Sequence, residues 1–413
     1  MSKPVKLLSL AVVCACVLLA INFGMRASFG FFMTPISKEF GYGREIFAFS
    51  LALQNLCWGL FQPIAGAVAD RFGTAKTIYV GSLAYALGLY ITATADSFWG
   101  LHIGAGILVG MGIAGTGLGI VLPALARMVS AEQRGLALGI GTAAGSFGQL
   151  LVIPVAQAFI LAYGWQVTLM ILAGGSLCML FLSGPFRNDG HAPALVSSES
   201  HPTQTQSLSE AIKEASGHLH YWLLIAGFFV CGFQLAFITV HMPAYLSDHG
   251  FDAKVAVISL SLIGLFNIFG CLLFGAWSGK YSKKNLLGII YLLRAIAIAG
   301  FMLLPMTNVS IYVFSIITGF LWLATVPPTS GLVAQMFGLK HMGTLYGIVF
   351  LNHQLGSFLG VWLGGYLYDS TGNYNIVWWS AAAIALVTAA IHIVIDERPV
   401  RRLRHAAGQP VTG

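Results

Sequence analysis

The amino-acid sequence predicts an all-α, polytopic membrane protein with twelve transmembrane helices, and three observations support this fold class. Hydrophobic residues make up 57% of the 413 residues and charged residues only 8%. Water-soluble domains carry about 25% charged residues, so this chain has too few charges to cover a water-facing surface. Apolar stretches of about 20 residues, the length that crosses a bilayer as a helix, recur along the chain. A polar segment divides them into two sets of six.

The apolar stretches are separated by short polar turns. Backbone amides and carbonyls cannot stay unpaired in lipid, so each stretch is expected to be helical. The first stretch follows Lys3 and Lys6, as in a signal peptide, but it continues to about Met33 and is too long for a cleaved apolar region. The predicted spans are 8–33, 46–69, 76–95, 99–123, 135–160, 165–184, 220–246, 255–278, 286–305, 309–334, 343–367 and 376–395.

The distribution of basic residues predicts the orientation. With the N-terminus inside, sixteen Lys and Arg residues fall on the cytoplasmic side, and three, Lys38, Arg44 and Lys254, fall outside. This positive-inside bias predicts a multi-pass protein of the plasma (inner) membrane with both termini in the cytoplasm. It also accounts for the net charge of +7 without a nucleic-acid partner.

A polar linker at 185–218, rich in Ser, Thr, Gln, Pro and His, follows the sixth span. It is expected to separate an N-terminal six-helix bundle at 1–184 from a C-terminal six-helix bundle at 219–395, and a basic cytoplasmic tail follows at 396–413. A short surface helix is expected in the linker near Ser209–Ser216.

The two halves resemble each other. The segment GAVADRFGTAK at 66–76 follows the second span, and the related segment GAWSGKYSKK at 275–284 follows the eighth, 209 residues later. Two similar six-helix bundles around a site at the bilayer midplane are the architecture of alternating-access transporters. The repeat therefore predicts two pseudo-symmetric bundles with a site between them.

The segment at 66–76 resembles the loop signature G-x-x-x-D-R-x-G-x-x-[RK] of the major facilitator superfamily, whose fold the whole chain is then expected to share. The resemblance implies a gating motif, in which Gly66 permits close helix packing and Asp70 pairs with an arginine or a helix N-terminus. The alternative is a solvated loop that only sets the topology. The residues of the gating motif are Gly66, Asp70, Arg71, Gly73 and Lys76.

Within that superfamily the chain looks most like the monocarboxylate and oxalate/formate porter branch. The similar stretches are GMRASFGFF at 24–32, RGLALG at 134–139 and GTAAGSFG at 141–148. The resemblance implies secondary transport of a small organic anion, proton-coupled or exchanging, by a protein that acts as a monomer without a cofactor. The acidic start of span one and the charges in span eight of the animal monocarboxylate carriers are missing, which leaves the coupling and the substrate open.

Arg26 is the strongest candidate for a substrate-binding residue. It lies about eighteen residues into the first span, with Asn22 one turn earlier on the same face. A charge at this depth costs about 3 kcal/mol or more, so it indicates a functional site. A guanidinium can clamp a carboxylate with two parallel hydrogen bonds. The alternative is an arginine that snorkels outward or bonds to backbone carbonyls.

Other polar residues in the spans are further candidates, each with a structural alternative. His353 and His241 can carry a proton near neutral pH, or can be hydrogen-bonded core histidines. Arg294 can contact substrate or brace the C-terminal half, and amides can bind substrate or join helices. The predicted substrate-binding set is Arg26, Asn22, His353, Gln354, His241, Gln234, Arg294, Gln54 and Gln149, with Asn55 also weighed.

Two other functions compete with anion transport. An efflux carrier for amphipathic or drug-like compounds is compatible with the many aromatic residues, but such carriers present a buried acid to a cationic substrate, and no span carries one deep in the membrane. A receptor or structural role would need a soluble module larger than the linker. An enzyme is not expected, because the sequence shows no nucleophile, base and oxyanion group and no cluster with metal-ligand spacing.

Overall fold

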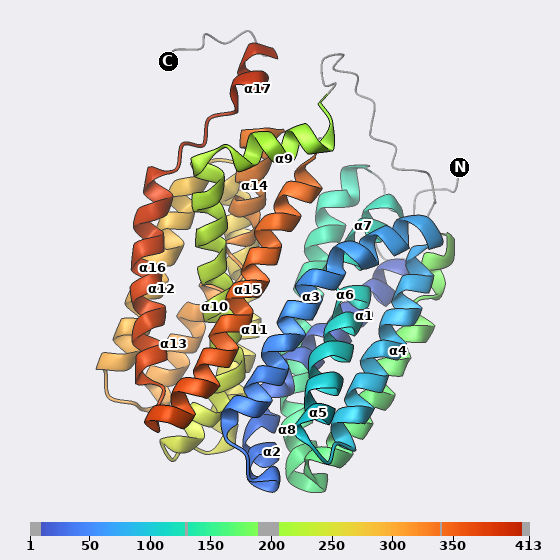
Figure 1. The fold of residues 1–413 in the computed structure, drawn as a ribbon, viewed down its shortest axis with the longest axis vertical. Coiled ribbons are helices and arrows are strands. Elements are labelled where there is room, and N and C mark those ends of the chain that lie inside the picture. The colour runs from blue at the N-terminus through green and yellow to red at the C-terminus, as the bar shows by residue number, and fades with distance from the viewer. Residues whose placement is uncertain (1–9, 129–130, 189–205, 339–340, 407–413) are drawn as a thin grey trace.

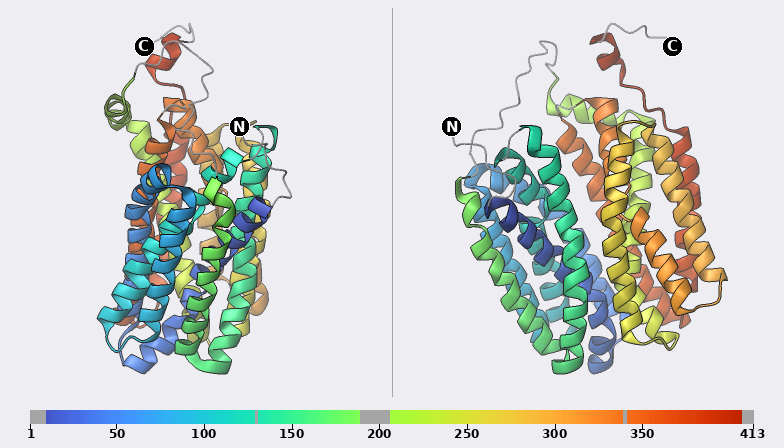
Figure 2. Two further views of the ribbon diagram at one scale, coloured as in Figure 1. Left: turned by 90° about the vertical axis from the view of Figure 1, so that its right-hand side faces the viewer. Right: turned by 180° about the vertical axis from the view of Figure 1, so that it is seen from behind.

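The computed structural model describes residues 10–128, 131–188, 206–338 and 341–406, and the regular elements in these ranges are all helices. The helices form two groups that lie side by side, one built from the first half of the chain and one from the second (Figure 1). The view from behind shows the same division (Figure 2).

The first group begins with a long, partly irregular helix and ends before the linker. Its elements are α1 (Leu10–Ser28), η1 (Phe29–Phe32), α2 (Met33–Phe40), α3 (Arg44–Phe72), α4 (Thr74–Ala93), α5 (Phe98–Leu101), η2 (His102–Leu108), α6 (Val109–Thr116), α7 (Leu118–Met128), α8 (Ala131–Leu182) and η3 (Gly184–Asn188). Inside α8, Gly164 has φ +79°, which favours glycine, and the helix reverses direction there. α8 therefore contains the fifth and sixth predicted spans.

The second group contains the remaining spans and two helices outside the bundle. Its elements are α9 (Leu208–Ser216), α10 (Leu219–Asp248), α11 (Ala253–Ser278), α12 (Lys283–Leu303), α13 (Asn308–Leu321), α14 (Val326–Phe337), α15 (Met342–Thr371), α16 (Asn375–Val394) and α17 (Arg401–Ala406). α9 lies at the end of the predicted linker, where the surface helix was expected. Its N-terminus is closed by a capping box between Ser207 and Glu210.

Eight segments of the described chain are long and apolar enough to cross a membrane. One of them, Gly139–Leu182, includes the reversal at Gly164 and covers two predicted spans. α3, α4 and α15, of 29, 20 and 30 residues, pack among these segments. With α8 counted as two spans and the broken fourth and tenth spans as one each, the described helices cover the twelve predicted spans.

The fourth and tenth spans are broken at equivalent places. In the fourth span, α6 ends at Thr116 and α7 begins at Leu118; in the tenth, α13 ends at Leu321 and α14 begins two residues after Ala324. Thr116 and Thr325, which flank the breaks, are 209 residues apart, the offset of the sequence repeat. Broken helices near the midplane are a feature of transporters with internal repeats.

Glycines allow α10 and α15 to pack closely within the second group. A Cβ atom built on Gly356 would lie 2.0 Å from the backbone oxygen of Phe229, and one on Gly360 would lie 2.3 Å from that of Phe233. Backbone atoms cannot move aside unless the two helices separate. Close packing, rather than flexibility, therefore explains these two glycines.

Gly356→Ala is expected to lower the stability of the protein by about 1–3 kcal/mol or more, because the added methyl group overpacks the α10–α15 contact. Gly347→Ala is the matched control, since it lies on α15 with no atom within 4 Å of its Cβ position. It should be neutral, or stabilising by up to about 1 kcal/mol through helix propensity. Thermal unfolding in detergent measures both variants, and equal stabilities would contradict the packing argument.

Candidate functional site

Arg26 lies near the end of α1 and is half-buried between helices of the first group. One Nη atom donates a hydrogen bond of 2.7 Å to Oδ1 of Asn55 on α3. The guanidinium carbon lies 5.0 Å from the centre of the Trp58 ring, close enough for a cation–π contact. Its Nε atom is buried without a partner, and none of the ion pairs among the described residues includes Arg26. Among the described residues, the positive charge is therefore compensated only by a neutral amide and an aromatic face.

Two aromatic rings connect the neighbourhood of Arg26 to the opposite half. Trp58 makes an edge-to-face contact of 5.5 Å with Phe350 on α15, and Phe350 stacks on His353 at 5.8 Å. His353 and the adjacent Gln354 are buried, and Nδ1 of His353 lies 3.1 Å from Oε1 of Gln354. Arg26 on the first span and His353 on the eleventh thus contact the same pair of rings from opposite sides. Arg26 contacts Trp58, and His353 contacts Phe350.

Gln354 faces the first half directly. A Cβ atom built on Gly59 of α3 would lie 2.8 Å from Cβ of Gln354, so the two helices touch at this point. The Nε2 atom of Gln354 is buried and donates to no partner. Buried polar groups without partners are rare, so each one requires an explanation.

Asn22 makes a hydrogen bond that recurs in the second half. Its Nδ2 donates to Oγ1 of Thr116 at the break of the fourth span. Cys231 on α10 lies 3.2 Å from Oγ1 of Thr325 at the break of the tenth span. Both residues of the second pair follow those of the first by 209 positions. The repeat predicted from the sequence is therefore visible in individual contacts.

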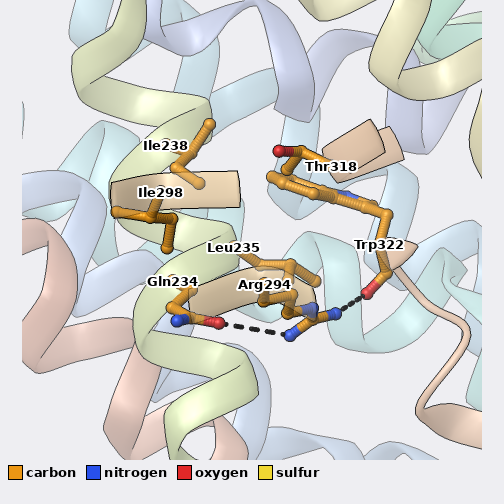
Figure 3. A pocket seen from close by; sticks show the side chains of 7 residues that line it. All are labelled: Gln234, Leu235, Ile238, Arg294, Ile298, Thr318 and Trp322. Carbon is orange, nitrogen blue, oxygen red and sulfur yellow. Dashed lines mark hydrogen bonds between the residues drawn. The ribbon is translucent and has the colours of Figure 1, made fainter. Parts of the chain in front are cut away.

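Arg294 lies on α12 and is 4% exposed, but unlike Arg26 it is fully engaged by backbone groups. One Nη atom donates to the carbonyl of Leu321, at 2.6 Å, where α13 ends. The same atom donates to the carbonyl of Trp322 (Figure 3). The other Nη atom lies 3.4 Å from Oε1 of Gln234 (Figure 3). Carbonyls left open by a helix break need such donors. The structural alternative for Arg294, a brace of the C-terminal half, accounts for these contacts.

Gln234 belongs to the Arg294 cluster rather than to the Arg26 neighbourhood. Its Nε2 donates to the carbonyl of Ala381 at 2.9 Å. Gln234 follows Arg26 by 208 positions, one fewer than the 209-residue repeat, and Arg294 follows Tyr85 by 209. The arginine thus sits on the first helix of one repeat and on the third helix of the other.

The remaining amide candidates join helices. Gln54 donates to the carbonyl of Ala105 at 2.8 Å and is 2% exposed, so its side chain ties α3 to η2 instead of reaching Arg26. Gln149 lines a small cavity between the halves together with Ala27 and Trp322. Nearby, Asn267 bridges the halves by donating to Oγ of Ser146 at 2.8 Å.

His241 lies in the C-terminal third of α10. This part of α10 runs to the end of the bundle opposite α9 and α17, which we call the distal end (Figure 1). Contacts between the two halves cluster there. Arg44 forms an ion pair of 2.6 Å with Asp248, and Asp369 accepts hydrogen bonds from the backbone amides of Arg44 and Glu45 at 2.9 and 2.7 Å. These four residues and Trp362, which donates to Glu45 at 3.0 Å, form what we call the distal latch.

The opposite charges of the distal latch stabilise one another. Burial alone would lower the pKa of Arg44, but hydrogen bonds to Asp248 and Tyr374 outweigh it and raise that pKa above its usual value. The guanidinium also lies 3.9 Å from the centre of the Tyr368 ring. Asp369 caps the N-terminus of α3, where a negative charge is favoured by the helix dipole. The latch therefore closes the distal end between the halves.

The predicted gating motif is only partly described. The side chain of Asp70 lies outside the described part of the structure, as do those of residues 131–138. Arg71 and Lys76 are exposed, and Gly73 has φ +105° between α3 and α4. A Cβ atom on Gly66 would meet nothing within 4 Å. The expectation that Gly66 permits close helix packing is therefore wrong for this conformation.

Sequence reasoning missed the partners that define the surroundings of Arg26. The sequence does not distinguish Trp58 and Phe350, because aromatic residues are common in every span, and Asn55 is one of several amides in the spans. A helical periodicity argument could have found one signal: Asn55, Trp58 and Gly59 share one face of α3 with a spacing of three to four residues.

The comparisons with known proteins agree with the helical architecture. The model of the Major Facilitator Superfamily matches residues 15–361. Similar curated proteins include the uncharacterized MFS-type transporter YcxA of Bacillus subtilis, 25% identical over 92% of this chain and 94% of its own length. Monocarboxylate transporter 13 of Rattus norvegicus is 23% identical over 91% of this chain and 86% of its own.

Solved structures share the fold at low sequence identity. A bacterial homologue of the human lysosomal transporter Spinster, inward-facing and unoccupied, has a TM-score of 0.70 and 14% identity, covering 93% of this chain and 94% of that one. The xylose transporter XylE from E. coli, inward open, has a TM-score of 0.68 and 15% identity, covering 93% and 95%.

Proposed function

Because the chain belongs to the Major Facilitator Superfamily of secondary transporters, we propose that it carries a small organic anion of the monocarboxylate type by alternating access. Residues 1–184 and 219–395 are the two bodies that rock in this proposal, with the cargo held between them. Its multi-pass membrane location follows from the family; the plasma (inner) membrane, with both termini in the cytoplasm, is part of the proposal.

The observation that carries the proposal is the incomplete compensation of Arg26. Its guanidinium has one neutral hydrogen-bond acceptor, one aromatic face and a buried Nε–H without a partner. Leaving a buried charge uncompensated is costly in a membrane. A carboxylate that accepts from Nε and a free Nη supplies both the missing hydrogen bonds and the missing negative charge.

The opposite half offers a second contact for the same cargo. Gln354 has a buried amide N–H without a partner, and it touches α3 beside Trp58. His353, next to it, can donate or accept a hydrogen bond. A cargo held by Arg26 from one half and by Gln354 or His353 from the other would have to release one of them whenever the halves rock apart.

The names of several relatives point the same way, since they include monocarboxylate transporters 12 and 13. At 23 to 25% identity these names favour a class of cargo and do not assign one. Coupling to protons or exchange of one anion for another, function as a monomer and independence from a cofactor complete the proposal.

The test is counterflow in proteoliposomes, with each small carboxylate paired with its neutral amide. We expect the acid to accelerate counterflow of the labelled acid, and the amide to compete at least tenfold more weakly, because each hydrogen bond to a charged group is worth about 1.5–3 kcal/mol. Equal competition by acid and amide would overturn the anion proposal. Export of amphipathic dyes with no carboxylate transport would favour an efflux carrier instead.

A further inference from the structure

His241 is joined to the distal latch by a directed chain of hydrogen bonds. Its Nε2 lies 2.8 Å from the backbone carbonyl oxygen of Val361 on α15. A carbonyl can only accept, so in the neutral ring Nε2 carries the proton and Nδ1 is an acceptor. Nδ1 lies 3.1 Å from the hydroxyl of Tyr374, which therefore donates to it.

Tyr374 is the link between the histidine and the latch. Its oxygen accepts a hydrogen bond of 3.0 Å from Nη1 of Arg44, whose two Nη atoms also bind Asp248 at 2.6 and 2.7 Å. Burial raises the pKa of Tyr374, even though Arg44 acts in the opposite direction, so the phenol keeps its proton. The donors run in one direction, from Arg44 through Tyr374 and His241 to Val361.

Protonation of His241 would reverse the direction of the hydrogen bond between its Nδ1 and the Tyr374 hydroxyl. The imidazolium donates at both nitrogens, so Nδ1 could no longer accept from Tyr374. The phenol oxygen would face two donors, Nδ1–H of His241 and Nη1–H of Arg44, and two positive charges would flank one neutral hydroxyl. Like charges this close repel each other, and burial between helices limits screening by water.

The histidine cannot turn away while the distal end is closed. A Cβ atom built on Gly364 of α15 would lie 2.4 Å from Nε2, and the ring packs against Phe237 and Tyr374 at 5.5 and 5.1 Å between centres. His241 itself is 1% exposed. Movement of Arg44, on the other half, away from His241 would relieve the repulsion.

The carboxylates of the distal latch bind other groups rather than His241. Asp248 and Asp369 are occupied by Arg44 and by the N-terminus of α3, and Glu45 accepts from Trp362. His249 binds the carbonyl of Tyr245 on the exposed side of α10. Among the described residues, no hydrogen bond or ion pair joins a carboxylate to His241. Tyr374 is the ionisable group that contacts His241 directly, and Arg44 follows one hydrogen bond further on. The other ionisable groups at this end of the bundle are Glu45, Asp248, Asp369, His249, Tyr245 and Tyr368.

We propose that His241 is the proton-binding residue that opens the distal gate: a proton arriving at its Nδ1 releases Arg44 from the latch, and loss of the proton lets the latch form again. The identity of the cargo that moves with the proton rests on the proposed function, and the rest of this proposal does not. The gate itself is independent of the cargo, so it can be tested without one.

The experiment measures the separation of the halves at the distal end by double electron–electron resonance. Spin labels replace Asp96 and Lys254, exposed residues in distal turns of the two halves, after the six native cysteines are replaced by serine or alanine. The protein is kept in lipid nanodiscs without substrate, between about pH 5 and about pH 8, the range in which histidine titrates.

A longer distance should appear as the pH falls, with the ratio of open to closed molecules rising by at most about tenfold per pH unit for one proton. His241→Gln keeps a donor for Val361 but cannot accept a proton, so it should stay closed at every pH. Tyr374→Phe breaks the chain and should also lose the response. His249→Gln, the matched control at the same end of α10, should respond as the unmodified protein does.

Arg44→Gln should show the longer distance at every pH, which establishes that the labels report opening. The proposal is overturned if the unmodified protein keeps one distance across the range, or if His241→Gln responds like His249→Gln. Because Arg26 plays no part in these measurements, failure of the gate and failure of the anion site are distinguishable.

Discussion

Arg26→Gln is expected to raise the KM for the transported anion by about 10- to 100-fold at equal expression. Glutamine can replace the contact with Asn55, but it removes the positive charge and the unpartnered Nε–H. Losing one hydrogen bond to a charged group costs about 1.5–3 kcal/mol, and 1.4 kcal/mol is tenfold in affinity. Initial rates of labelled uptake in proteoliposomes measure the effect.

Two variants sharpen the result. Arg26→Lys keeps the charge but loses the planar pair of donors, so its KM should lie between that of the unmodified protein and that of Arg26→Gln. Lys254→Gln removes a cation that is exposed at the start of α11 and should leave the KM unchanged. Unaltered uptake by Arg26→Gln, or an equal effect of Lys254→Gln, would exclude the anion clamp.

The fold could be predicted from the sequence because it depends on properties that are local. Apolar length fixes each span, and the break at Gly164 lies within the polar turn expected between 160 and 165. The repeat of 209 residues predicted two similar halves, and it reappears in the Asn22–Thr116 and Cys231–Thr325 contacts. These features need no knowledge of which helices are neighbours.

The candidate site could be predicted only in part, because it depends on neighbours. Arg26 was found by its depth in an apolar span, but the sequence did not show that Trp58 and Phe350 lie between it and His353. Pseudo-symmetry suggested that Gln234 corresponds to Arg26. It could not show that Gln234, on the seventh span, has Arg294, on the ninth span, as its hydrogen-bond partner.

Arg26, which is half-buried, and Arg294, which is buried, therefore have opposite chemical situations inside their spans. Arg294 donates to two carbonyls at the break of the tenth span, so its charge is compensated within the protein. Arg26 has no comparable set of acceptors among the described residues. Depth in the membrane alone would assign both to the substrate, whereas the acceptors around each one separate a binding residue from a structural one.

Arg294→Met is accordingly expected to lower stability by about 2–6 kcal/mol, because it leaves the carbonyls of Leu321 and Trp322 buried without donors, at about 1–3 kcal/mol each. Thermal unfolding in detergent should show a clearly lower Tm for this variant and almost none of that change for Arg26→Gln. The fraction of Arg294→Met that remains folded should keep its KM, since the brace does not touch the cargo. An increase in KM without a loss of stability would instead make Arg294 a ligand of the anion, and the distinction between the two arginines would fail.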